Sequence, residues 1–130
     1  MRKTPEAGGL NVLYGNGRVR CVQTHPLNGT LVIKTVCFEG EEQTALYQQV
    51  LYSQIDQAAE GKRMAIAVEL TPEELRGGKH RQLIKRFQAD CGLENMDVVE
   101  EMILRGYRFF AHYIGASDEL LIVAKGLQIT

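Results

Sequence analysis

The sequence predicts an α+β fold: a mixed, mainly antiparallel sheet of about six strands, in the order βββ-α-β-α-α-ββ, with helices packed on it. Its 130 residues are the length of one domain. A hydrophobic fraction of 45% and a charged fraction of 24% are typical of a globular protein. Strand-like segments at both ends of the chain enclose a middle part with helical spacing. We expect a single α+β domain over residues 1–130, with residues 1–9 as a flexible tail.

The first part of the chain predicts an antiparallel meander. Residues 11–14 and 18–22 flank Asn16-Gly17, a dipeptide that suits a type I′ hairpin turn because both residues tolerate positive φ. A second turn, around Pro26, separates these strands from residues 30–38, which are rich in β-branched side chains. Three consecutive antiparallel strands are the expected result.

The period of the apolar residues then changes to a helical one. Over residues 41–60, Leu46, Val50 and Ile55 fall near i, i+4 spacing, which predicts an amphipathic helix. A short apolar strand follows at residues 64–70. The order strand, helix, strand implies a right-handed crossover, so we expect the third and fourth strands to be parallel.

Two further helices are predicted before the chain returns to strands. The motif Thr71-Pro72-Glu73-Glu74 starts a helix, because the threonine can cap it, the proline fits the first turn and the last glutamate completes a capping box. This helix is interrupted at Gly77-Gly78 and resumes over residues 79–91. A second helix is expected over residues 95–105, with one apolar stripe.

The last segment predicts a hairpin of residues 107–114 and 119–125. Within it, Leu120-Leu121-Ile122-Val123 is continuously apolar, and an exposed strand of that composition would promote aggregation. Both faces of this strand must therefore be covered, either by the rest of the monomer or by a second copy of the chain. On this ground we predict a homo-oligomer.

The stretch from Arg76 to Arg86 is the most informative for function. On a helix that advances about 100° per residue, one side of it is apolar and the opposite side is cationic. The glycines before it leave backbone N–H groups accessible at a helix N-terminus, where donors and macrodipole favour an anion. Lysine and arginine add charged donors. We predict a phosphate or nucleic-acid binding site at Gly77, Gly78, Lys79, Arg81, Lys85 and Arg86.

A plainer interpretation of the same stretch stays open. The following helix and its approach carry four acids that could lie across the basic side and neutralise it: Glu94, Asp97, Glu100 and Glu101. Even without such pairing, a charged helix face is usually solvated surface, and an exposed ion pair contributes under about 1 kcal/mol.

A second candidate site lies in the strand near the C-terminus. Strand alternation places Arg108, Phe110 and His112 on one face, where they could line a pocket with a cation, a ring and a titratable imidazole. Alternatively, one face of this strand is core and the other is amphipathic surface. The three histidines are too scattered, and the three cysteines too unevenly spaced, to predict a metal site or a disulfide framework.

The composition limits the location and the partners. A net charge of −1 excludes a protein that is basic throughout, although a local basic patch is compatible with it. The sequence has no apolar run of the roughly 18 residues that a membrane span needs, and the first nine residues lack the apolar part of a secretion signal. We expect a cytoplasmic protein with no membrane partner.

Together these observations predict a non-catalytic binding or regulatory protein without a cofactor. It would engage a phosphorylated small molecule or a nucleic-acid backbone through the Gly-Gly turn and the basic helix. Two alternatives stay open: an oligomeric interaction or adaptor protein with no small ligand, and a small enzyme in which His25 or His112 acts as a general base in a pocket.

Overall fold

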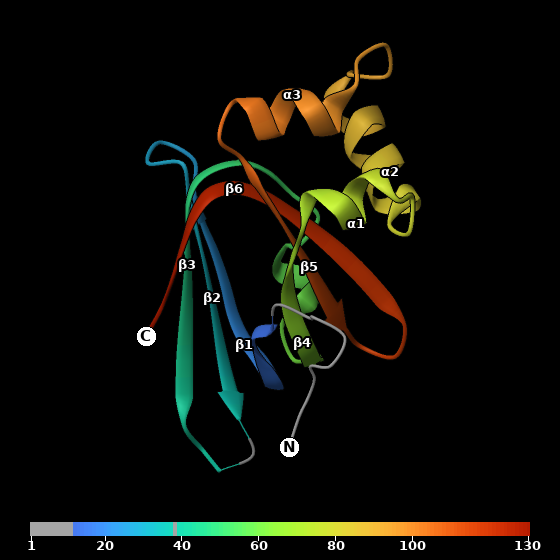
Figure 1. The fold of residues 1–130 in the computed structure, drawn as a ribbon. Helices are drawn as coiled ribbons and strands as arrows, with labels where there is room; N and C mark the ends of the chain where they lie inside the picture. The colour runs from blue at the N-terminus through green and yellow to red at the C-terminus, as the bar shows by residue number, and fades with distance from the viewer. Residues whose placement is uncertain (1–11, 38) are drawn as a thin grey trace.

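The computed structural model describes residues 12–37 and 39–130, so the expected tail lies outside the described residues. Six strands form a closed barrel in the order β1-β2-β3-β6-β5-β4, and each neighbouring pair is antiparallel (Figure 1). The strands are β1 (Val12–His25), β2 (Thr30–Cys37), β3 (Glu42–Ser53), β4 (Arg63–Leu70), β5 (Arg108–Ile114) and β6 (Asp118–Ile129). The predicted α+β class and the number of strands are confirmed. The prediction of a mixed sheet with one parallel pair is wrong, because every neighbouring pair is antiparallel.

The helices lie together on one side of the barrel (Figure 1). They are α1 (Pro72–Arg76), α2 (Arg81–Cys91) and α3 (Val98–Leu104), all between β4 and β5 in the chain, and a 3₁₀ turn, η1 (Gln57–Ala59), precedes β4. Their apolar residues pack on the outer face of β4, β5 and β6. Within the described part of the chain, no helix has the length and apolar character of a membrane span.

Two apolar cores result, and β6 contributes to both. Ile122 and Ala124 point into the barrel, whereas Leu121 and Val123 pack under the helices. The apolar run in this strand is thus covered on both faces within one chain. It therefore gives no argument for a homo-oligomer.

The predicted hairpin at Asn16-Gly17 is wrong, because the chain runs straight through these residues as part of β1. Asn16 has a positive φ of 60°, but it distorts the strand without reversing it. The glycines on either side of it lie against neighbouring backbones. A Cβ atom would be 2.6 Å from the Ala65 carbonyl oxygen at Gly15 and 2.9 Å from the Val36 carbonyl oxygen at Gly17. These glycines serve close strand packing rather than a turn.

The predicted helix over residues 41–60 is also wrong; this region forms β3 and η1. Gln49 has a φ of 50°, and the pairing of β3 with β6 shifts register just beyond it. Such irregularities shift the inward-facing positions, so Tyr47 and Val50, three residues apart, both pack on the barrel core. The predicted helix had used Leu46 in place of Tyr47, and Leu46 belongs to neither apolar core.

The helix signals in the middle of the chain are confirmed. Thr71 Oγ1 accepts a hydrogen bond from the Glu74 N–H at 3.1 Å, and the Glu74 carboxylate accepts one from the Thr71 N–H at 2.9 Å. The helix ends at Gly77, and α2 ends at Gly92 in the left-handed conformation. The last predicted helix is shorter than expected, because Asp97 caps α3 and delays its start.

Removing the Thr71 hydroxyl is expected to lower the free energy of unfolding by about 1 kcal/mol, because the Glu74 N–H loses its acceptor. Urea unfolding of Thr71→Ala measures this change. Thr71→Ser keeps the hydroxyl and is the matched control. Equal stability of the two variants would contradict a contribution from the cap.

Candidate functional site

The predicted basic residues lie on the turn between α1 and α2 and on the exposed side of α2. Leu83 and Phe87 bury the opposite side of this helix against the barrel. At the turn, Gly78 has a φ of 80°, and a Cβ atom there would lie 3.3 Å from the Arg81 guanidinium. The Arg81 side chain therefore folds back over the glycine turn.

The acids of α3 do not lie across this surface as a group. Glu100 accepts a bidentate hydrogen bond from Arg76, with its second contact at 2.9 Å, and this bond holds the pKa of the Glu100 carboxyl below its usual value. Glu101 pairs with Arg105 at 2.7 Å on its own helix. Asp97 accepts the Glu100 N–H as the helix cap. Two of these acids are thus paired with arginines outside the predicted site.

The cations of the site fall into two groups. Arg86 lies 3.7 Å from Asp90, one turn further along α2. Lys79, Arg81 and Lys85 are exposed, and none of them forms an ion pair with any described residue. We call Gly77, Gly78, Lys79, Arg81, Lys85 and Arg86 the basic face.

The start of α2 has no side-chain cap and no acid in its first turn among the described residues. His80 occupies the cap position, but its ring points inward. Its Nδ1 lies 3.1 Å from a carboxylate oxygen of Glu119 on β6, and the Tyr113 hydroxyl donates to the same oxygen. The second ring nitrogen, Nε2, is buried without a described partner. His80 thus anchors the helix start to the barrel and leaves its first N–H groups without a side-chain acceptor.

The second candidate site is located in the barrel interior. Phe110 and His112 do share a face with Arg108, as predicted, but both are fully buried in core. Arg108 forms a bidentate ion pair with Glu69, at 2.9 and 2.7 Å, which raises the pKa of the guanidinium. Phe110 and His112 therefore form part of a filled interior, whereas the Arg108 side chain is 41% exposed.

The barrel interior contains a chain of hydrogen bonds that the sequence did not predict. The hydroxyls of Tyr14 and Tyr47 are 2.7 Å apart, and the Tyr47 hydroxyl is 2.5 Å from His112 Nε2. The other ring nitrogen, Nδ1, lies 3.2 Å from the Leu120 carbonyl oxygen. Because a carbonyl only accepts, Nδ1 holds the proton, so Tyr47 donates to Nε2 and Tyr14 donates to Tyr47. We call Tyr14, Tyr47 and His112 the interior relay.

Burial determines the ionisation of the interior relay. It lowers the pKa of His112 to about 4 and raises that of Tyr47 well above its usual value. All three groups are therefore neutral near pH 7. A general base needs contact with a substrate, and His112, with no exposed surface, offers none in this conformation.

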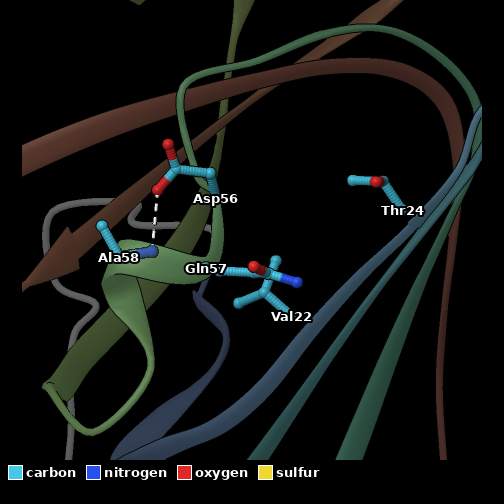
Figure 2. A pocket seen from close by; sticks show the side chains of 5 residues that line it. All are labelled: Val22, Thr24, Asp56, Gln57 and Ala58. Carbon is cyan, nitrogen blue, oxygen red and sulfur yellow. Dashed lines mark hydrogen bonds between the residues drawn. The ribbon is translucent and has the colours of Figure 1, made fainter.

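Two adjacent recesses lie beside η1 and have part of their lining in common. The first has a volume of about 460 Å³ and is lined by Val22 and Thr24 of β1 and by Asp56, Gln57 and Ala58. Figure 2 shows the Gln57 side chain directed towards Val22, whereas the Asp56 carboxylate is directed towards the Ala58 N–H. The second has a volume of about 210 Å³ and shares Asp56 and Ala58 with the first. The described lining of these two recesses contains no histidine.

A metal site is not evident within residues 12–37 and 39–130, where no group of three His, Cys, Asp or Glu side chains could hold an ion. Comparison with known proteins found no matching family model, curated protein or solved structure. A function is therefore inferred from the chemistry of the residues.

Proposed function

We propose that this protein binds a phosphate-bearing ligand, either a phosphorylated small molecule or a nucleic-acid backbone, on the basic face. The observation that carries the proposal is that Lys79, Arg81 and Lys85 are exposed without an ion-pair partner among the described residues. By contrast, Arg76 and Arg105 each form an ion pair with a glutamate of α3. An anion would provide the missing negative charge on α2.

The uncapped start of α2 supports the same ligand. The Arg81 N–H donates to the Gly78 carbonyl oxygen at 3.3 Å, but no side chain caps the helix start. The positive end of the helix dipole favours an anion there. Arginine adds a planar pair of donors and lysine a mobile charge, and both suit phosphate oxygens. Gly77 and Gly78 allow a phosphate to approach the backbone closely. The ligand would lie over the turn, with Lys85 and Arg86 extending the positive field along the helix.

Binding to the basic face is expected to depend strongly on salt. With about three phosphate contacts, the affinity for a short oligonucleotide should fall about 20–40-fold between 50 and 200 mM salt. Fluorescence anisotropy with labelled single-stranded and duplex oligonucleotides measures this directly. A thermal-shift panel of nucleotides and sugar phosphates tests the small-ligand form of the proposal.

The double variant Arg81→Ala/Lys85→Ala should lose most of the affinity and most of the salt dependence. Its matched control is Arg20→Ala/Arg105→Ala, which removes the same charge from exposed arginines elsewhere. If both double variants bind alike, net charge and not the basic face is responsible. An affinity that is equal at both salt concentrations would also contradict the proposal.

A further inference from the structure

The two recesses beside η1 differ in their polar chemistry. The first is lined by the polar residues Thr24, Asp56 and Gln57, beside the apolar Val22. Asp56 also lines the second recess, and its carboxylate is directed away from Thr24 (Figure 2). The described lining of the first recess has no cation, so this recess is unsuited to a phosphate. Its volume of about 460 Å³ is within the usual range of small-molecule sites.

The carboxylate of Asp56 is held in place for an external donor. Its Oδ1 accepts the Ala58 N–H at 2.9 Å, the bond drawn in Figure 2, which fixes the side chain at the start of η1. A carboxylate has about four acceptor positions, so most of them stay available. Thr24 and Gln57 can each donate and accept. Because Asp56 lines both recesses, a ring with several hydroxyls would contact it from either one.

The second recess joins this polar region to the basic face. Two cations, Arg86 of α2 and Lys62, and two acids, Asp56 and Asp118, line it. Both cations have only loose ion pairs, Arg86 with Asp90 at 3.7 Å and Lys62 with Asp118 at 4.0 Å. A phosphate could replace these carboxylates at little cost. Arg86 therefore belongs to both the basic face and the recess.

We propose that the recesses beside η1 bind a phosphorylated sugar, with the sugar hydroxyls on Thr24, Asp56 and Gln57 and the phosphate near Lys62 and Arg86. This inference rests on the proposed phosphate binding and assigns a ligand to the Arg86 end of the basic face, which the second recess adjoins. The sugar phosphate is either free or part of a nucleotide. In both cases a polyhydroxylated ring lies next to an anion, which is the combination that the two recesses present.

Calorimetric titrations with inorganic phosphate, ribose 5-phosphate and adenosine monophosphate test this inference. Ribose 5-phosphate should bind the unmodified protein at least about tenfold more tightly than inorganic phosphate, because its hydroxyls add hydrogen bonds, one of them to a charged acceptor. Adenosine monophosphate distinguishes the two sources of the sugar phosphate. Tighter binding than that of ribose 5-phosphate indicates a nucleotide, and weaker binding indicates a free sugar phosphate.

The variant Asp56→Asn keeps the shape and the capping oxygen but removes the charged acceptor. It should reduce the preference for ribose 5-phosphate over inorganic phosphate about tenfold. Thr24 does not cap η1, so Thr24→Val tests the sugar contact without changing that cap. This variant should reduce the same ratio. Glu41→Gln, an exposed acid in the turn before β3, is the matched charge control and should leave the ratio unchanged. Thermal unfolding checks that each variant is folded.

The outcomes separate the two proposals. If phosphate binds the basic face but ribose 5-phosphate binds no more tightly, the sugar site is wrong and phosphate binding stands. If Asp56→Asn and Thr24→Val both leave the ratio unchanged, the recesses do not hold the sugar. If no phosphate-bearing probe binds at low salt, both proposals are wrong.

Discussion

Replacing Tyr47 with phenylalanine is expected to lower the free energy of unfolding by about 2–6 kcal/mol. The hydroxyl of Tyr47 is the middle member of the interior relay, so its loss leaves the His112 Nε2 acceptor and the Tyr14 hydroxyl donor without their partner. Each unsatisfied buried polar group costs about 1–3 kcal/mol. The ring itself, which packs edge-to-face on Phe110, is retained. Equilibrium unfolding in urea measures the change.

Tyr14→Phe is the matched control for this variant, because it removes a hydroxyl from the end of the relay. Tyr47 still donates to His112, so only about 1 kcal/mol should be lost. The Tyr47→Phe variant should therefore have a clearly lower free energy of unfolding than the Tyr14→Phe variant. If the two variants are equally stable, hydrogen bonding along the relay does not explain the stability of the barrel interior.

Acidification from pH 7 to 4 is expected to remove up to about 3 kcal/mol of stability through His112 alone. Burial lowers the pKa of this histidine from 6.5 to about 4 in the folded protein. Between these values the unfolded chain binds more protons than the folded one, so stability falls as the pH decreases. The contribution is fully present above pH 6.5 and is lost as the pH approaches 4.

Urea unfolding at pH 7, 5.5 and 4.5 tests this dependence. His112→Asn cannot titrate, so its stability should vary less over this range than that of the unmodified protein. Every other side chain is the same in both proteins, so the difference between them reports on His112. The prediction fails if the two proteins lose the same free energy between pH 7 and 4.5.

Local signals in the sequence predicted local structure well. The capping box at Thr71 and the break at Gly77-Gly78 act over three or four residues, and both are present in the structure. The two incorrect elements have a common physical cause. Positive φ at Asn16 and Gln49 distorts a long strand without ending it, and only pairing with distant strands keeps the chain extended there.

Long-range contacts limited the prediction of the sites in the same way. Helical periodicity was enough to predict the exposed basic side of α2, but not that Glu100 would pair with Arg76, 24 residues away. The interior relay joins Tyr47 to His112 across 65 residues, and nothing in the local sequence around either one indicates the other. The recesses beside η1 were missed because their region was predicted to be a helix.

The three α-helices occupy one continuous segment of the chain, between β4 and β5. Residues 71–107 leave the barrel after Leu70 and return at Arg108, and Leu70 pairs with Phe109 across the ladder of β4 and β5. The ring of paired strands is complete without this segment, which is an insertion at the end of a hairpin. A different insertion is expected to preserve strand register, provided that it still shields Val68, Phe109 and Leu121.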